Sequence, residues 1–182
     1  FPYPPYNHRT ALTQHEITQL YESTETLIDK AMLGIFYGCG LRRSEGENLN
    51  RDDIKFNEKI LIVREGKGLK RRVVPIAERV KEDFENYYYK ERRLNAGAKQ
   101  EQAFMLNRKG YRMTRDSYNP RLRYLVKKSG LNKSVCLHQL RHSIATHLLE
   151  QGMSIEKVRD FLGHKYIDTT QRYTHINELK LH

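Results

Sequence analysis

The chain has 182 residues, a length that suits one domain with a sizeable buried core. Charged residues make up 30%, and both signs are interspersed through periodic segments, which excludes an intrinsically disordered chain. The net charge is +11, with 33 lysines and arginines spread along the sequence, so a polyanionic partner such as nucleic acid is favoured over a merely solvated basic surface.

Helix-capping residues and apolar periodicity predict a mainly helical chain. Thr13 and Glu16 form a capping-box pattern, and Gly38 ends an apolar helix. Pro120 is expected to kink the fifth helix or to delay its start, because proline cannot donate a backbone hydrogen bond. In chain order, the expected helices begin at Thr13 and then cover residues 26–37, 41–48, 77–95, 114–128, 138–151, 155–162 and 169–173.

A different pattern separates the third and fourth helices. Residues 55–56, 60–63 and 72–75 are rich in β-formers, and turn residues at 57–58 and 66–68 divide them. Three short strands joined by tight turns form an antiparallel meander. The predicted fold class is therefore α+β, mainly α-helical with a small three-stranded antiparallel sheet.

The chain opens with Phe1 and a proline-dense run that cannot continue a helix or a central strand. We therefore expect residues 1–11 to be an interdomain linker and residues 12–182 to form one domain, with an upstream part missing from this sequence. No stretch approaches the length of a membrane span, and no signal peptide is visible.

No cofactor and no metal ion is expected. Cys39 and Cys136 are far apart without CxxC spacing, which indicates neither a disulfide framework nor a zinc site and fits a reducing cytoplasm. The histidines of residues 138–147 lack an HExxH spacing and a nearby acidic ligand. The adjacent Asp52 and Asp53, just before a strand, fit a turn better than a two-metal nuclease site.

His138 and Arg141 lie three residues apart in a predicted helix, so their side chains share a face. Together they can donate several hydrogen bonds to the oxygens of one phosphate. His142 follows round the same helix and is expected behind this pair. Taken alone, the pair is equally consistent with the surface of an ordinary amphipathic helix.

Arg42 opens a short helix just after a glycine turn, where the helix N-terminus and the guanidinium both favour an anion. Glu45, three residues on, can orient this arginine by a salt bridge. Lys67 stands between two glycines at a predicted hairpin tip, without the spacing of a Walker A loop. Taken singly, each of these charges fits an ordinary solvated surface.

Two further residues lie near the C-terminal end of the sequence. His164 follows a glycine at a predicted helix end, where a backbone can approach a ligand closely. Tyr173 lies in a polar segment further on, and since the chain has 12 tyrosines, any one of them alone is more typical of a core anchor than of a nucleophile.

In combination, these segments resemble the tyrosine recombinase (phage integrase) family, most closely its Xer-like and transposon-integrase members. The resemblance extends from about Leu12 to the end of the chain, and five motifs in family order make it specific. The motifs are Gly-Leu-Arg-Arg-Ser-Glu at 40–45, Gly-Lys-Gly at 66–68 with Val-Pro at 74–75, His-Gln-Leu-Arg-His at 138–142, Leu-Gly-His at 162–164 and Thr-Thr-Gln-Arg-Tyr-Thr-His at 169–175.

The resemblance implies an active enzyme that breaks and rejoins DNA strands, because every catalytic position holds the residue type that the family uses. Tyr173 would attack a backbone phosphate, and Glu45 and His142 would support the catalytic residues. The product is a 3′-phosphotyrosine bond that another strand's 5′-hydroxyl reseals without ATP. The implied catalytic set is Arg42, Lys67, His138, Arg141, His164 and Tyr173.

The implied partners are double-stranded DNA and other recombinase protomers in a synaptic tetramer, in the bacterial cytoplasm and away from membranes. An upstream helical DNA-binding domain would close the clamp around the duplex. Two departures from the family pattern stand out: Arg43 replaces a usual aliphatic residue, and the tail after Tyr173 is short, which bears on self-assembly.

Two other functions compete with this interpretation. A type IB topoisomerase uses similar chemistry, but the motifs at 138–142 and 162–164 match recombinases more closely. A DNA-binding module that keeps the fold without catalysis would have no need of the complete catalytic set.

Overall fold

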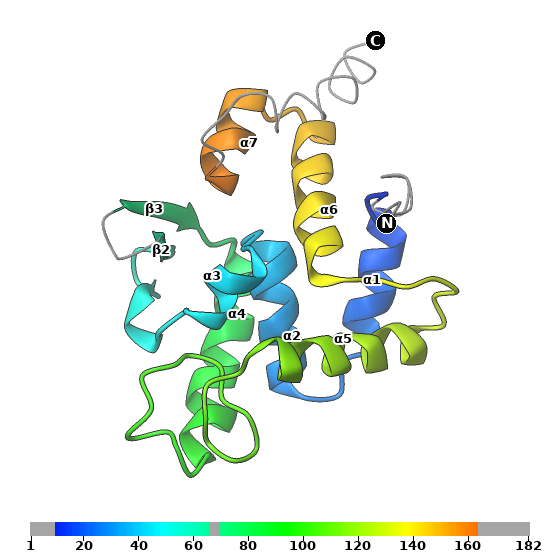
Figure 1. Ribbon diagram of the computed structural model, residues 1–182. Coiled ribbons are helices and arrows are strands. Elements are labelled where there is room, and N and C mark those ends of the chain that lie inside the picture. Colours follow the sequence, from blue (N-terminus) through cyan, green and yellow to red (C-terminus); the bar gives the residue numbers. More distant parts are fainter. Residues whose placement is uncertain (1–9, 66–69, 164–182) are drawn as a thin grey trace, which may run out of the picture.

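Helices make up most of the structure, a computed structural model that describes residues 10–65 and 70–163, and one small sheet lies at its edge (Figure 1). The strands β1 (Ile54–Lys55), β2 (Ile60–Glu65) and β3 (Lys70–Pro75) are antiparallel in the order β1-β2-β3. This confirms the predicted α+β fold class, mainly α-helical with a three-stranded antiparallel sheet. The helical segments are α1 (Gln14–Glu22), α2 (Leu27–Leu33), the π-helical turn η2 (Gly34–Gly38), α3 (Arg43–Glu47), the 3-10 turn η3 (Arg51–Asp53), α4 (Glu78–Asn86), the π-helical turn η4 (Tyr87–Glu91), the 3-10 turn η5 (Arg92–Leu94), α5 (Arg115–Ser129), α6 (Leu137–Glu150) and α7 (Ile155–Leu162).

Capping side chains start the first two helices where the sequence predicts. Thr13 Oγ1 accepts a hydrogen bond from the Glu16 N–H at 3.1 Å, and the Glu16 carboxylate accepts one from the Thr13 N–H at 2.9 Å. At the start of α2, Asp29 accepts from the Thr26 N–H at 3.2 Å. Asp29 is buried and also pairs with Arg121 of α5 at 2.6 Å, so one carboxylate joins α2 to α5.

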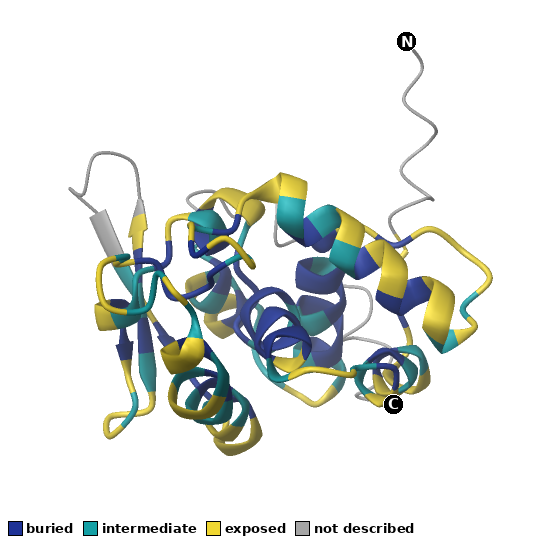
Figure 2. Ribbon diagram, turned by 90° about the horizontal axis from the view of Figure 1, so that it is seen from below, coloured by how far each residue is buried: buried dark blue, intermediate teal, exposed yellow. Residues whose placement is uncertain are grey.

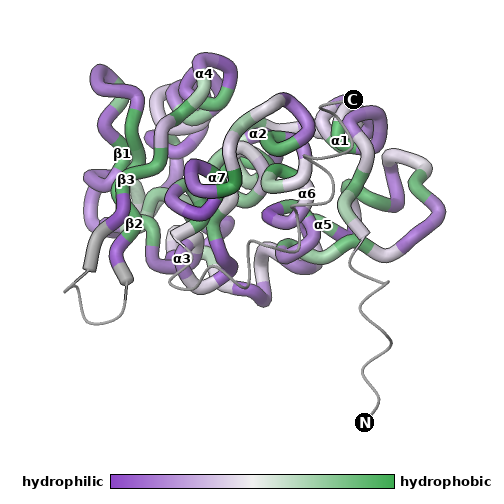
Figure 3. Tube along the Cα trace, turned by 90° about the horizontal axis from the view of Figure 1, so that it is seen from above, coloured by the Kyte–Doolittle hydropathy of each residue, from purple (hydrophilic) through white to green (hydrophobic). Residues whose placement is uncertain are grey.

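The core lies around the central helices α2 and α6. Figure 2 shows buried residues gathered in the middle of the molecule, and in Figure 3 the outer loops are mostly hydrophilic. Aromatic side chains join segments that are far apart in the sequence. Phe36 of η2 contacts Tyr118 of α5 edge to face, with ring centroids 5.0 Å apart. Phe84 of α4 meets Phe104 in the same way at 5.4 Å. Helix α6, which carries part of the predicted site, packs against η2.

The sheet places one face of β3 against the protein interior. Leu61 pairs with Val74 and Val63 pairs with Arg72 across β2 and β3. Leu61, Val63 and Val74 are buried, whereas Val73 is 54% exposed on the other face. Since side chains alternate between the two faces of a strand, Arg72 shares the buried face with Val74.

The helix predicted over residues 77–95 is α-helical in α4, then π-helical in η4 and 3-10 helical in η5. Two buried polar groups accompany these changes. The Tyr87 hydroxyl accepts a hydrogen bond from the Leu106 N–H at 3.0 Å. The Arg92 guanidinium donates to the carbonyls of Ala98 at 3.0 Å, Glu101 at 2.8 Å and Phe104 at 2.9 Å, and so holds the following loop against the helix.

Other predicted boundaries differ little from the observed ones. The helices of residues 26–37, 41–48, 138–151 and 155–162 are confirmed, with shifts of a few residues at their ends. The first strand begins at Ile54 rather than at the predicted residue 55. Of the two alternatives for Pro120, a delayed start of α5 is wrong, because the helix begins at Arg115 and contains the proline. A kink at Pro120 stays a prediction. The predicted turn at 66–68 and the helix at 169–173 lie outside the described residues.

Candidate active site

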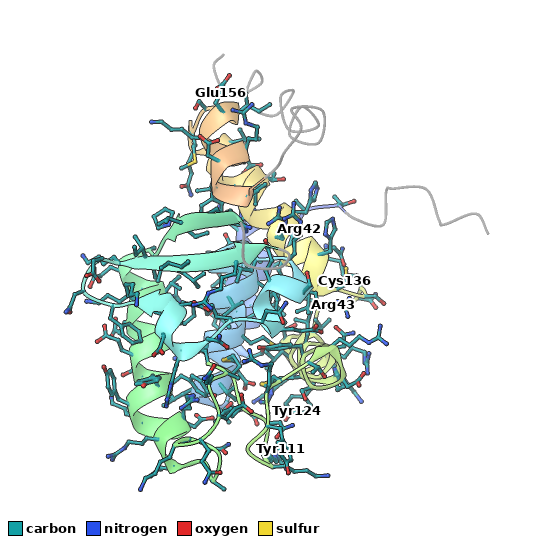
Figure 4. The ribbon with its side chains drawn as sticks, turned by 60° about the vertical axis from the view of Figure 1, so that its left-hand side comes forward. Arg42, Arg43, Tyr111, Tyr124, Cys136 and Glu156 are labelled. Carbon is teal, nitrogen blue, oxygen red and sulfur yellow. The ribbon has the colours of Figure 1, made fainter. Side chains whose placement is uncertain are left out.

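A tight turn between η2 and α3 brings the first candidate residue into place. Gly40 has a φ of +63°, and a Cβ there would lie 3.0 Å from Cε1 of Phe161 and 3.1 Å from Cγ2 of Ile144. Glycine therefore allows both the left-handed turn and the close approach of α6 and α7. Arg42 follows as the residue that caps α3, with its side chain 41% exposed. Figure 4 shows Arg42 on the side of the molecule where α6 begins.

The Glu45 carboxylate is the centre of a cluster of three arginines. Its side chain is only 6% exposed. It accepts a hydrogen bond from the Arg42 N–H at 2.8 Å, and its Oε2 lies 3.3 Å from Arg42 Nη1. Arg72 donates to both carboxylate oxygens, with Nη2 at 3.0 Å from Oε1. Arg141 Nη1 lies 3.9 Å from Oε1. The predicted salt bridge between Glu45 and Arg42 is confirmed, and the cluster carries an excess of positive charge that suits an anion.

Arg141 joins this cluster to the turn before α3 and to the C-terminal end of α7. Its side chain is 4% exposed, and its guanidinium donates to the Gly40 carbonyl at 2.5 Å and to the Leu162 carbonyl at 2.7 Å. The Gly40 carbonyl belongs to the turn before α3, and the Leu162 carbonyl lies at the C-terminal end of α7, where carbonyls lack intrahelical donors. One arginine of α6 therefore fixes the turn before Arg42 and the C-terminal end of α7.

The two histidines predicted beside Arg141 lie on the same helix. His138 is exposed in the first turn of α6, and His142 is half-buried one turn further on. Cys136, labelled in Figure 4, precedes this helix and is exposed. His138 is thus exposed on α6, whereas Arg141, three residues further along the same helix, is buried; together they can present donors to a phosphate.

Another histidine of α6, His147, has a structural role. Its Nε2 lies 2.7 Å from the Leu12 carbonyl, which can only accept, so Nε2 carries the proton. Its Nδ1 then accepts from the Tyr37 hydroxyl at 2.7 Å. Burial, with the nearby charge of Glu150, raises the pKa of Tyr37 to about 12, so that hydroxyl keeps its proton. Both ring nitrogens are engaged in protein hydrogen bonds.

Three of the predicted catalytic residues, Lys67, His164 and Tyr173, lie outside the described residues. The elements that lead to two of them are described. Strands β2 and β3 flank the segment with Lys67, and α7 ends at Leu162 with Gly163 as its C-cap, just before His164. Both β3 and α7 reach the arginine cluster: Arg72 Nε donates to the Phe161 carbonyl at 3.3 Å.

The sequence interpretation missed Arg72. A signal was present, because alternation along β3 puts Arg72 on the same face as the buried Val74, and an arginine that is largely covered needs a partner. That partner is Glu45, which the sequence interpretation assigned to Arg42 alone. In the structure, the Glu45 carboxylate lies within 4 Å of three arginine side chains, where the sequence predicted one pair.

The electrostatic state of Glu45 follows from these contacts. Burial alone would raise the pKa of this carboxyl, but the hydrogen bonds and charge of Arg72, the Arg42 N–H and the charge of Arg141 together lower it below its ordinary value of 4.5. Glu45 is therefore ionised at neutral pH and neutralises part of the cationic cluster.

Replacement of Glu45 by glutamine should cost stability in a pH-dependent way. A carboxyl whose pKa is lowered by folding stabilises the folded state above its unfolded pKa, and this contribution is lost as pH falls through the folded value. At pH 7 we expect Glu45→Gln to lower the free energy of unfolding by about 3 kcal/mol, since it leaves buried guanidinium charge uncompensated. Urea unfolding from pH 7 to pH 3 measures this. The gap between the two proteins should begin to narrow near pH 4.5 and close as pH falls further, through the lowered pKa of Glu45 in the folded protein; a gap that stays constant contradicts the assignment.

Within residues 10–65 and 70–163, no group of three or more metal-ligating side chains lies close enough together to hold an ion. Asp53, considered in the sequence as part of a metal nuclease site, instead accepts from the Asn50 N–H at 2.9 Å and pairs with Arg64 at 2.9 Å. Its carboxylate thus fixes a turn and the neighbouring strand. No helix of the described chain has the length and apolar character to cross a membrane.

Comparison with known proteins identifies relatives with this fold. The chain is 39% identical to the tyrosine recombinase XerA of Pyrococcus horikoshii over 171 residues, which cover 91% of this chain and 56% of that protein. It is 38% identical to the tyrosine recombinase XerC of Chlamydia caviae over 149 residues, or 82% of this chain and 47% of that protein. The chain therefore spans about half the length of these relatives.

Among solved structures, the crystal structure of XerA recombinase matches with a TM-score of 0.84 and 31% identity, over 94% of this chain and 62% of that one. The sequence model of the phage integrase family matches residues 10–180. This match covers the arginine cluster, α6 and α7 as well as all five motifs. The resemblance inferred from the sequence is confirmed, and the chain belongs to the tyrosine recombinase (phage integrase) family.

Proposed function

We propose that this chain is the catalytic domain of a site-specific DNA recombinase that cleaves and rejoins strands through a covalent 3′-phosphotyrosine intermediate at Tyr173. One observation carries the proposal: in a member of the phage integrase family, Arg42 and Arg141, distant in sequence, both lie beside one buried carboxylate, that of Glu45. The net charge of +11 supports double-stranded DNA as the substrate.

The nucleophile must lose a proton during attack. A phenol with a pKa near 10 is only about 0.1% ionised at neutral pH, so Tyr173 needs a base as its oxygen attacks the scissile phosphorus. His138, exposed in the first turn of α6, is our candidate for that base. The bond from phosphorus to the tyrosine oxygen forms as the bond to the 5′ oxygen breaks.

Charge on the phosphate and on the leaving oxygen must be stabilised in the same step. Arg42 and Arg141, with His164, donate to the non-bridging oxygens, and donors of this kind are each worth about 3 kcal/mol. Lys67 supplies the proton to the 5′ oxygen. Rejoining reverses the step, because the phosphotyrosine bond retains the energy of the phosphodiester and a 5′-hydroxyl can attack it.

We further propose that residues 1–11 link this domain to an upstream DNA-binding domain and that residues 12–182 form the catalytic domain. The described part supports a boundary there: Leu12 is buried, its N–H donates to Ser143 Oγ at 2.8 Å, and its carbonyl accepts from His147 at 2.7 Å. On DNA, protomers would act together in a synaptic tetramer in the cytoplasm.

Covalent trapping tests the proposal. The complete polypeptide is incubated with fragmented genomic DNA, and the fragments that stay attached to protein after denaturation are sequenced to find the site. A duplex of that site, nicked next to the cleavage position, then loses its 5′-hydroxyl strand by diffusion and cannot be resealed. We expect an adduct that survives detergent and heat and that requires neither a metal ion nor ATP. The proposed function is overturned if no fragment stays attached to the protein, or if no nicked duplex of an enriched site forms an adduct.

A further inference from the structure

Arg72 of β3 is largely covered by the residues of the arginine cluster and by α7. Its side chain is 10% exposed, against 41% for Arg42, so it lies behind the surface that a phosphate would reach. It donates to both oxygens of Glu45 and, through Nε, to the Phe161 carbonyl at 3.3 Å. Arg72 therefore joins the sheet, the start of α3 and the last turn of α7.

We propose that Arg72 is a positioning residue: by holding Glu45 and the end of α7, it keeps Arg42 and Arg141 oriented towards the scissile phosphate. This inference rests on the proposed function. Arg72 acts through its neighbours and makes no contact with the substrate.

The charge of Glu45 is balanced mainly by Arg72. Glu45 is the carboxylate shared by the three guanidinium groups, and Arg72 engages both of its oxygens. With Arg72 in place, Arg72 compensates most of the negative charge of Glu45, so Glu45 neutralises less of the charge of Arg42 and Arg141. Without Arg72, Glu45 would draw these two arginines into closer pairing, because a buried carboxylate is stabilised by the nearest available cations.

The Arg72 side chain lies directly against the backbone of Gly163. Gly163, the C-cap of α7, has a φ of +72°, and a Cβ there would lie 2.6 Å from Arg72 Cδ and 2.9 Å from both its Nε and its Nη1. A side chain at Gly163 would therefore displace the guanidinium. Gly130, the C-cap of α5, has a similar φ of +81° but no atom within 4 Å of such a Cβ. The two glycines form a matched pair for testing the contact with Arg72.

Single-turnover cleavage of the nicked duplex by the complete polypeptide, at saturating protein, tests the charge argument. We expect Arg72→Met to slow cleavage about 100-fold, the scale seen when one preorganised donor is lost. Binding to uncleaved DNA, measured in the Tyr173→Phe background, should change less than about 3-fold, because Arg72 is not on the DNA surface. Arg72→Lys, which keeps the charge, should recover about 10-fold.

The double variant Arg72→Met/Glu45→Gln separates positioning from mere structural support. If Glu45 captures the other arginines when Arg72 is absent, removing its charge should make the double variant cleave faster than Arg72→Met alone. A residue needed only for folding would give a double variant that is slower or unchanged and has a lower Tm. A double variant no faster than Arg72→Met overturns the proposal.

Gly163→Ala should slow cleavage about 10-fold, and Gly130→Ala should cleave like wild type, although both place alanine at a positive φ. Equal cleavage rates in Gly163→Ala and Gly130→Ala would overturn a role for the contact between Gly163 and Arg72.

Hydrogen exchange tests the anchoring of α7 without DNA. Exchange at the Leu162 and Gly163 amides should be faster in Arg72→Met than in wild type. If wild type forms an adduct and Arg72→Met forms it equally fast, this inference fails and the proposed function stands. If wild type forms none, both fail.

Discussion

The Tyr173→Phe variant should bind the recombination duplex as wild type does and form no covalent adduct with it. Phenylalanine keeps the ring but removes the oxygen that would become bonded to phosphorus. Loss of a nucleophile lowers catalysis by roughly 10⁴-fold or more, which places the adduct below detection. Gel-shift titration and denaturing electrophoresis on the same nicked duplex measure binding and adduct formation together.

Tyr111→Phe is the matched control. Tyr111 is 65% exposed and lies at the end of the molecule away from Arg42 (Figure 4). Its removal should leave both binding and adduct formation unchanged. An adduct formed by Tyr173→Phe at the wild-type rate would assign the nucleophile to another residue, whereas loss of binding in that variant would give Tyr173 a role in DNA recognition.

Arg141→Ala should have the second largest effect, on the cleavage step. A donor to the developing phosphate charge is worth about 2.7–4 kcal/mol, so we expect single-turnover cleavage to fall by about 10²–10³-fold. The same change removes the donors to the Gly40 and Leu162 carbonyls, and unsatisfied buried carbonyls should lower the free energy of unfolding by about 2–4 kcal/mol. DNA binding, measured well below the unfolding temperature, should largely survive.

Arg43→Ala is the control for Arg141→Ala. Its side chain is 45% exposed and pairs with Glu47 at 3.5 Å, away from the Glu45 carboxylate. Loss of this surface pair should cost less than about 1 kcal/mol of stability and leave the cleavage rate close to that of wild type. If Arg141→Ala weakens DNA binding as much as it slows cleavage, Arg141 serves binding and not catalysis.

Local chemistry made most of the fold predictable from the sequence. Thr13 with Glu16 forms the capping box that the sequence indicated, and Gly163 ends α7 in the left-handed conformation that favours glycine. The changes of helix type at Tyr87 and Arg92 could not be predicted. They coincide with hydrogen bonds to residues 98–106, and such tertiary contacts leave no trace in local periodicity.

Part of the candidate site was equally predictable. The pairing of Arg42 with Glu45 follows from their spacing at the start of a helix. The contacts of Arg141 with the Gly40 and Leu162 carbonyls join residues far apart in sequence, so spacing could not reveal them. Arg72 was missed for a different reason. The chain has many basic residues, and Arg72 stands out only when its place on the inward face of β3 is read from strand alternation, as for an apolar residue.

The most direct test of the account is to identify the residue that becomes bonded to DNA. The trapped complex is digested with nuclease and protease, and mass spectrometry locates the nucleotide-bearing peptide and the polarity of its linkage. We expect a 3′-phosphate attached to the oxygen of Tyr173. A linkage to any other side chain, or to a 5′-phosphate, would contradict the proposed site and its chemistry.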